Sequence, residues 1–258
     1  MKRGKKMVII VIAILAVIGL ITWGAIAYLG RGQTLSIKSI KNPRGDLHVI
    51  RLAKPTNMTW NAGSYAKITL PSTASDGKKN DYTGDQTSRW LSIASSPEDN
   101  EIVIVTHNSG SPYKKALTSL PAGSKVEMSW LDSSLSVTDS NEPLVCFASD
   151  VGISAMRPIV RQWAGKRPVI LYHLDKEVTV FDKELSELAN KTANITYETN
   201  ASLSQSQEHV AQAINKYGNR AQYLLAGQPD DVKAMKKLLT DKGIDSKNVK
   251  SSTFRGLK

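Results

Sequence analysis

The sequence predicts an α+β protein of two domains: an antiparallel Greek-key β-barrel followed by a doubly wound parallel α/β domain, preceded by one transmembrane helix. Three observations predict this class. Residues 7–29 form an uncharged apolar run, short alternating segments separated by turn residues follow to about residue 137, and strands alternate with helical segments from about residue 141. The predicted boundaries are 1–30 for the membrane anchor, 31–140 for the barrel and 141–258 for the α/β domain.

Composition excludes several classes of protein. One cysteine among 258 residues rules out an intramolecular disulfide framework, and four scattered histidines lack ligand spacing, so no metal site is expected. The formal net charge is +11, but residues 1–31 hold five Lys or Arg and no acid. The remaining excess is spread over the chain without a nucleic-acid-binding motif. We therefore expect no nucleic-acid partner.

The apolar run at residues 7–29 predicts contact with the bilayer. It reads MVIIVIAILAVIGLITWGAIAYL between KRGKK and RGQ, and a helix of that length spans about 34 Å, enough for the hydrocarbon core. A cleaved signal peptide is the alternative, but its apolar region is usually about 7–15 residues long and is followed by a small-x-small site, whereas this run is longer and its exit at residues 28–31 offers no good Ala-x-Ala. We therefore expect an uncleaved, single-pass anchor in the cell membrane.

The charges around the apolar run are nearly balanced, so they give only a slight preference for the side of the membrane on which the globular part lies. Basic residues flank the run at both ends, with Arg31, Lys38 and Lys41 following it. The short basic N-terminus favours a cytoplasmic start and an extracytoplasmic globular part.

Six alternating segments predict the barrel. Gly, Pro, Asn and Asp separate them, as in antiparallel sandwiches and barrels. Residues 72–88 lack apolar periodicity and predict a long surface loop, and a short helix is expected from Pro112. The predicted strands are 35–41, 47–53, 65–71, 89–95, 101–107 and 125–130.

Five further strands alternate with helices in the second half of the chain, which predicts a parallel sheet with right-handed crossovers. In such sheets ligands bind beyond the carboxyl ends of the strands, and phosphates bind at helix N-termini. The predicted strands are 143–149, 167–174, 193–200, 221–227 and 248–254, and the predicted helices are 152–165, 181–191, 207–218 and 229–243.

Two strand-to-helix turns are therefore candidate phosphate sites. In the turn after the first strand, Gly152 would let the backbone approach a phosphate and Ser154 could donate a hydrogen bond. The alternative is a helix start that serves packing alone. In the turn 225–230, Pro229 and Asp230 suit the first helical positions whatever the function.

One barrel segment, 89–97 (RWLSIASSP), combines a cation, large apolar side chains and hydroxyls. Arg89 and Ser92, on either side of Trp90 and Leu91, could hold a phosphate and an aromatic ring together. An ordinary strand with an exposed arginine is the alternative. Cys146 lies in an apolar strand and is expected to be a buried core thiol.

Taken in order, five motifs resemble the ferredoxin–NADP reductase-type flavoproteins. The resemblance covers about residues 34–256. The motifs are AGSY (62–65), RWLSIASSP (89–97), PLVCFA (143–148), VGISAMR (151–157) and AGQP (226–229).

The resemblance implies that the barrel binds FAD, that the α/β domain binds NAD(P)H, and that a hydride moves between nicotinamide and flavin N5. It places Arg89 on the flavin nucleotide's phosphate, Leu91 and its neighbour Trp90 against the isoalloxazine, and Ser92, the implied catalytic residue, near N5. The remaining implied contacts are Tyr113 and Lys114 in a second phosphate-binding turn, and Gly152, Ser154, Met156, Gly227 and Pro229 at the nicotinamide nucleotide.

The sequence departs from the family pattern at ligand positions. Leu91 stands where a tyrosine is usual, Ala226 replaces a cysteine beside the hydride path, and Ser149 and Asp150 replace two glycines of the nucleotide loop. A carboxylate beside a pyrophosphate is electrostatically adverse, at roughly 4 kcal/mol for like charges about 4 Å apart at an effective dielectric constant near 20.

Two functions follow as hypotheses. The first is a membrane-anchored, FAD-dependent oxidoreductase that moves electrons between a nicotinamide nucleotide, or a membrane redox partner or quinone, and an acceptor. The second is a non-catalytic binding or assembly module that retains the reductase scaffold without its nucleotide site.

Overall fold

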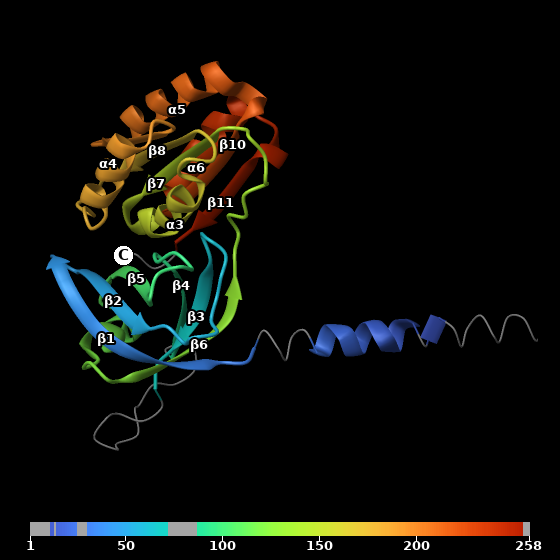
Figure 1. The fold of residues 1–258 in the computed structure, drawn as a ribbon, viewed down its shortest axis with the longest axis vertical. Helices are drawn as coiled ribbons and strands as arrows, with labels where there is room; N and C mark the ends of the chain where they lie inside the picture. The colour runs from blue at the N-terminus through green and yellow to red at the C-terminus, as the bar shows by residue number, and fades with distance from the viewer. Residues whose placement is uncertain (1–10, 13, 25–29, 72–86, 255–258) are drawn as a thin grey trace, which may run out of the picture.

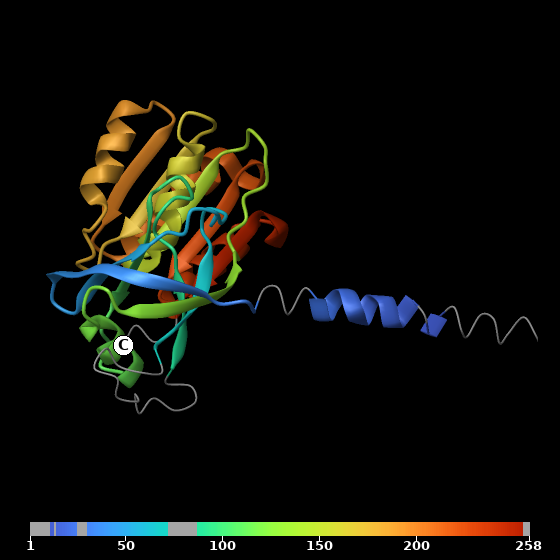
Figure 2. The ribbon, with the colours of Figure 1, turned by 60° about the horizontal axis from the view of Figure 1, so that its bottom comes forward.

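Two β-sheets organise the chain. The computed structural model describes residues 11–12, 14–24, 30–71 and 87–254. A six-stranded antiparallel sheet comes first, and a five-stranded parallel sheet flanked by helices follows. Seen from two sides, the blue and green strands of the first sheet lie against one end of the yellow to red α/β domain (Figures 1 and 2). The predicted order of an antiparallel and then a parallel α/β unit is confirmed.

The first sheet has the strand order β4-β3-β6-β1-β2-β5. Its end strands are linked just past β4, where the Ala94 N–H donates to the Val103 carbonyl at 2.7 Å, so the sheet curls into a barrel. With that closure, β3 to β6 follow the Greek-key order, because β6 returns to lie beside β3. The strands are β1 (Gln33–Arg44), β2 (Leu47–Ala53), β3 (Tyr65–Thr69), β4 (Ser88–Ser92), β5 (Glu101–His107) and β6 (Lys125–Asp132).

Strand β5 contributes to two cores because its side chains alternate. Ile102 and Ile104 pack inside the barrel, whereas Val103 and Val105 face the α/β domain. Successive side chains of a strand point to opposite faces, so a strand that is apolar on both faces can join two layers.

A short helix, α2 (Pro112–Ser119), closes one end of the barrel. The Ser111 side chain caps it by accepting from the Lys114 N–H, and Pro112 occupies the first turn, where no intrahelical N–H is needed. Tyr113 and Leu117 are buried in the barrel core. The helix predicted from Pro112 is confirmed.

The second sheet has the order β11-β10-β7-β8-β9, and every neighbouring pair is parallel. Side chains of α3 and α4 belong to one core on one face, and those of α5 and α6 belong to another on the opposite face. The strands are β7 (Leu144–Ser149), β8 (Val169–Leu174), β9 (Ile195–Asn200), β10 (Gln222–Gly227) and β11 (Val249–Thr253), and the helices are α3 (Ile153–Trp163), α4 (Asp182–Lys191), α5 (Leu203–Tyr217) and α6 (Pro229–Asp241).

The barrel and the α/β domain share one apolar interface. Val103 and Val105 of the barrel belong to the same buried cluster as Ile159 and Val160 of α3. Polar contacts border it: Arg157 donates to the Ala94 carbonyl at 2.7 Å, and Arg161 donates to both carboxylate oxygens of Asp99 at 2.9 and 3.0 Å. Contacts of both kinds hold the two parts together.

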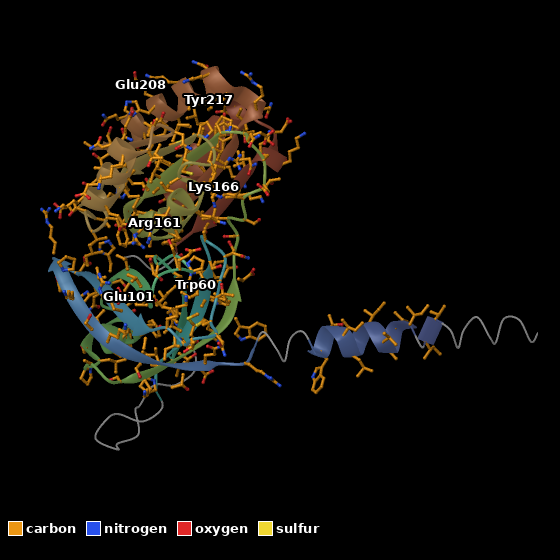
Figure 3. All side chains as sticks on the ribbon, viewed as in Figure 1. Trp60, Glu101, Arg161, Lys166, Glu208 and Tyr217 are labelled. Carbon is orange, nitrogen blue, oxygen red and sulfur yellow. The ribbon has the colours of Figure 1, made fainter. Side chains whose placement is uncertain are left out.

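The predicted transmembrane segment, 7–29, lies partly outside the described residues. Residues 11–12 and 14–24 are helical, and their large apolar side chains are exposed, from 51% at Val11 to 71% at Trp23 (Figure 3). Among the described residues, no helix has both the length and the apolar character needed to span a bilayer.

Several strand boundaries in the barrel differ from the predicted ones, as at β1 (33–44, predicted 35–41), and the predicted loop can be compared only at its end. Most of the predicted loop 72–88 lies outside the described residues, and its last residue, Ser88, already belongs to β4. The strand predicted to reach Ser95 ends at Ser92, because Ser95 bends the chain and its hydroxyl accepts from the Val103 N–H at 3.0 Å.

A close backbone approach at Gly227 generates a stability prediction. Gly227 has a φ of +135°, and a Cβ there would lie 2.2 Å from the Ser149 carbonyl oxygen, whereas one at Gly243 (φ +79°), in the turn that ends α6, would meet nothing within 4 Å. We expect Gly227→Ala to lower the free energy of unfolding by about 2 kcal/mol or more, and Gly243→Ala by only about 1 kcal/mol from backbone strain. Urea unfolding of both variants measures this, and equal losses would contradict it.

Candidate functional site

A cavity of about 430 Å³ lies where the barrel meets the α/β domain. Five of the residues predicted to bind the flavin line it, namely Arg89, Trp90, Leu91, Ser92 and Lys114. The other lining residues are Tyr65, Val105, Thr106, Ser134, Val151, Ser251, Ser252, Thr253 and Phe254.

Strand β4 presents the apolar wall of the cavity. It pairs with β3 so that Tyr65 lies opposite Ser92 and Ala66 opposite Leu91. Leu91 is buried, whereas the Trp90 side chain is half exposed and meets the Tyr65 ring edge-on, with ring centres 5.5 Å apart. An aromatic pair therefore stands at the edge of a cavity whose wall is apolar.

Two cations line the same cavity. Lys114 comes from the first turn of α2 and is buried, and its ammonium donates to the Thr106 hydroxyl. Burial, assisted by the nearby charge of Arg89, lowers the pKa of Lys114 to about 8. Within the described residues, no Asp or Glu lines this cavity. Two positive groups without a lining carboxylate make it suited to an anion.

Tyr113, also predicted to contact a phosphate, lies in the barrel core. It is fully buried, its hydroxyl donates to the Ile68 carbonyl at 2.9 Å, and the Arg89 guanidinium lies 5.5 Å above its ring. Tyr113 therefore contacts Arg89 through a cation–π interaction and does not line the cavity.

The tail of β11 forms part of the cavity wall, although its residues were not among those predicted to bind the flavin. Residues 251–254 reach the cavity because β11 pairs in parallel with β10, and the Phe254 N–H donates to the Gly227 carbonyl at 2.8 Å. Only the sheet order brings this C-terminal segment back to the barrel.

The residues predicted for a nicotinamide nucleotide lie at the ends of β7 and β10, where they pack against each other. A Cβ at Gly152 would lie 2.3 Å from the Ala226 carbonyl oxygen, so this glycine serves a backbone contact. The buried Ser154 hydroxyl donates to the Val151 carbonyl. Met156 is fully buried in the core, and Pro229 begins α6 beside a separate surface hollow.

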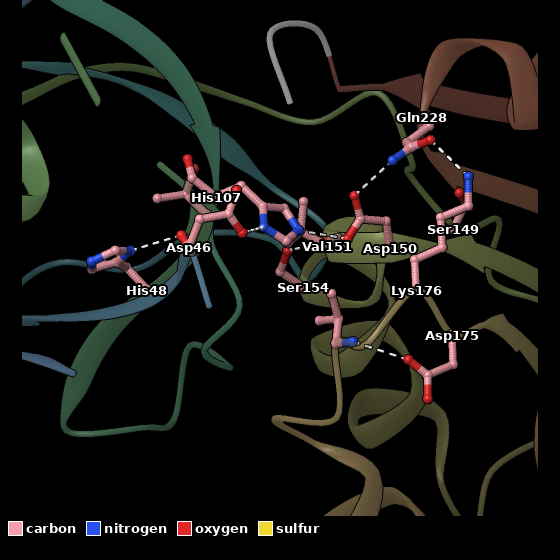
Figure 4. A network of polar contacts seen from close by, with 12 residues as sticks. Asp46, His48, His107, Ser149, Asp150, Val151, Ser154, Asp175, Lys176 and Gln228 are labelled. Atoms are coloured by element: carbon pink, nitrogen blue, oxygen red, sulfur yellow. Dashed lines mark hydrogen bonds and ion pairs between the residues drawn. The ribbon is translucent and has the colours of Figure 1, made fainter. Parts of the chain in front are cut away.

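Asp150 occupies this turn in a left-handed conformation, with a φ of +57°. Its side chain is 3% exposed, with one carboxylate oxygen 2.7 Å from His107 Nε2 and the other accepting from Gln228 Nε2 at 2.9 Å (Figure 4). The other imidazole nitrogen, His107 Nδ1, lies 2.6 Å from Asp46. We call these four residues the Asp150 cluster; it joins the barrel to the α/β domain.

Charges in the Asp150 cluster stabilise each other. Burial alone would raise the pKa of Asp150, but hydrogen bonds from His107 and Gln228 outweigh it and hold that pKa below its ordinary value. The hydrogen bond to Asp150 raises the pKa of His107, against the lowering effect of burial, and Asp46 adds to the rise. Both shifts favour the charged forms, an imidazolium beside a carboxylate.

Further contacts fix Gln228 from its other side. Lys176 donates to the Gln228 side-chain oxygen and to Asp231, both at 2.7 Å, and Ser149 donates to the same Asp231 carboxylate oxygen. Asp150 stood out in the sequence but His107 did not, because nothing in a histidine at the end of a strand indicates a partner 43 residues away.

The fold is similar to those of several solved flavoproteins. Cytochrome P450 reductase GcoB from Amycolatopsis superposes with a TM-score of 0.71 at 18% identity, over 87% of this chain and 70% of that one. A ferredoxin–NADP⁺ reductase from Neisseria gonorrhoeae, solved with bound FAD and NADP, gives 0.65 at 13% identity over 86% and 98%. The FAD/NAD-binding domain of a Vibrio cholerae nitric oxide dioxygenase gives 0.66 at 15% identity over 86% and 98%.

These likenesses show that the chain has the fold of ferredoxin–NADP reductase-type flavoproteins. No family model and no curated protein matches the sequence.

The His107–Asp150 pair generates a pH prediction. Because the pKa of His107 is raised above its ordinary value of 6.5, its contribution to stability is complete below that pH and is lost as pH rises through the raised value. We expect His107→Gln to lower the unfolding free energy by about 2–4 kcal/mol at pH 6 and by less at pH 9. Urea unfolding at both pH values measures the change.

His48→Gln is the matched control, since His48 lies near the same Asp46 but makes no contact with Asp150. A His107→Gln loss that is the same at both pH values would contradict the assignment.

Proposed function

We propose that this chain is a membrane-anchored, FAD-dependent oxidoreductase that moves electrons between a donor and an acceptor. The donor is a nicotinamide nucleotide or a membrane redox partner such as a quinone in its reduced form. The observation that carries the proposal is the cavity that combines Arg89 and Lys114 with an apolar and aromatic wall at the junction of two domains.

The residues present fit a flavin nucleotide. Its phosphates are anionic, and the cavity offers two cations with no lining carboxylate among the described residues. Its ring system is flat and apolar, and Trp90, Leu91 and Phe254 offer flat or apolar side chains on the same cavity. FAD, when bound, supplies the chemistry of accepting and releasing one or two electrons.

The chain's own residues have the following roles in this proposal. Arg89 and Lys114 hold the phosphate, and Leu91 with Trp90 holds the ring. The Ser92 hydroxyl lines the same cavity and orients the ring's polar edge as a hydrogen-bond partner. Phe254 and Val151 cover the cavity from the α/β side and exclude water.

The membrane part of the proposal rests on the sequence of residues 7–29, which contains no charged residue. The large apolar side chains of the described helical residues 11–12 and 14–24 are more than half exposed, which a protein surrounded by water rarely tolerates for so many neighbouring residues. The short basic N-terminus favours a cytoplasmic start, so we place the globular part outside the cytoplasm.

A non-catalytic binding or assembly module is the second candidate. It is favoured by the Asp150 cluster, which occupies the turn predicted for the nicotinamide nucleotide with protein side chains. A protein that retains its packing after losing turnover would keep the two cores and the cluster together.

Flavin binding tests the leading proposal. The full chain purified in detergent should be yellow or should take up FAD, with a flavin absorbance spectrum. Lys114→Met should weaken FAD binding by about tenfold or more at pH 7, because one charge-assisted hydrogen bond contributes roughly 1.5–3 kcal/mol. Since the pKa of Lys114 is about 8, FAD affinity of the wild type should fall as pH rises past this value, and the variant should lack that fall.

Lys115→Met is the matched control, because Lys115 is exposed on the same helix and lies outside the cavity lining. Colourless protein that takes up no FAD under any condition would contradict the oxidoreductase and leave the non-catalytic module.

Membrane anchoring has its own test. The full chain should stay with membranes after alkaline carbonate extraction, and a protease added to intact cells should digest the globular part. The double variant Leu15→Arg and Ile18→Arg should release it, since each arginine costs about 2.5–3.5 kcal/mol at the centre of a spanning helix. Wild-type protein that washes off the membrane would contradict the anchor.

A further inference from the structure

The order of strands in the α/β domain marks one crevice as the expected ligand site. From β7 the chain proceeds to β8 and β9 on one side and then to β10 and β11 on the other, so the direction of winding reverses between β7 and β10. In doubly wound sheets, ligands bind outside the carboxyl ends of the two strands at such a reversal. Here those ends are the turns that carry Asp150 and Gln228.

These two turns are bonded to each other. The Gln228 amide donates to the Asp150 carboxylate at 2.9 Å, and the backbone at Gly152 lies against the carbonyl of Ala226 so closely that no Cβ would fit. His107 reaches the same carboxylate from the barrel, on the side away from Gln228 (Figure 4). Side chains from both domains therefore meet in the crevice where a ligand would enter.

The groups of this crevice that could bind a phosphate already make hydrogen bonds or ion pairs with other residues of the protein. The Ser154 hydroxyl is turned toward the Val151 carbonyl, and Lys176, the cation that contacts Gln228, is paired with Asp231. The side chain at the head of the turn is an anion, which repels a phosphate. The residues of this crevice do not fit the pyrophosphate of a nicotinamide nucleotide.

The left-handed backbone of Asp150 supports a specific role for its side chain. A non-glycine residue with a positive φ costs about 1 kcal/mol or more relative to glycine, and glycine would adopt the same turn freely. The carboxylate offsets that strain with two hydrogen bonds, one of them to the other domain. Position 150 therefore holds a residue with a more strained backbone than glycine would have, and its side chain links the two domains.

We propose that the Asp150 cluster closes the crevice between β7 and β10 to dinucleotide phosphates, so that electrons reach the flavin cavity from a donor that is not a bound nicotinamide nucleotide. The inference concerns the donor side of the oxidoreductase and rests on the proposed function. It narrows the donor to a redox protein or a membrane quinol.

Nucleotide binding to the full-length, FAD-loaded protein in detergent tests this. NADP⁺ and NAD⁺ are titrated by calorimetry, and saturation-transfer NMR detects weak binding. We expect no binding to the wild type at millimolar concentration, and binding at least tenfold tighter to Asp150→Gly. Asp150→Asn, which removes the charge but keeps the shape, should show a smaller gain and serves if the glycine variant fails to fold.

Glu177→Gly is the matched control. Glu177 is exposed and also has a positive φ (+71°), so this change relieves a left-handed residue without touching the Asp150 cluster. It should leave nucleotide binding at the wild-type level.

Wild-type protein that binds either nucleotide as tightly as the Asp150 variants would overturn the inference. So would folded Asp150→Gly and Asp150→Asn variants that both bind no better than the wild type. A sample without a flavin spectrum is a different result, because it contradicts the proposed oxidoreductase and says nothing in favour of a closed crevice.

Discussion

The apolar interface between the barrel and the α/β domain is the constraint on which the candidate sites depend. The alternation of β5 produces it, since the same strand packs isoleucines inside the barrel and turns Val103 and Val105 outward against α3. With the domains fixed in this way, the β11 tail reaches the barrel cavity and His107, at the end of β5, reaches Asp150. A shift of β5 by one residue would exchange the two faces and disrupt both contacts.

The flavin cavity and the crevice between β7 and β10 are lined by charges of opposite sign. Arg89 and Lys114 line the cavity, and the burial of Lys114 beside Arg89 lowers the pKa of the lysine. An anionic ligand would stabilise the charged form of the lysine and offset this effect. The crevice between β7 and β10 instead holds a carboxylate that is paired with the His107 imidazole. The cavity and the crevice therefore differ in the sign of the charge that they present, although both lie at the same interface.

Much of the fold followed from local pattern. Alternating apolar residues predicted the barrel strands, and the change from this alternation to helical spacing of apolar residues predicted the α/β elements. Such predictions work because the residues on the buried face of a strand or helix recur at the period of that element. The candidate cavity was predicted in part: Arg89, Trp90, Leu91, Ser92 and Lys114 line it, whereas Tyr113 lies in the core beneath Arg89. The segment 251–254 was not predicted to line it, since its place depends on strand order across the sheet.

Residue types and their spacing were enough to predict the two-part architecture, the apolar run at residues 7–29 and a carboxylate in the turn after β7. The role of that carboxylate became visible only once the chain was folded. The resemblance to the reductases implies that Asp150 faces a pyrophosphate, whereas in the fold it is a buried partner of His107 and Gln228. A buried carboxylate needs charge and hydrogen-bond partners, and here these are His107 at the end of β5 and Gln228 after β10, which lie far from Asp150 in the sequence.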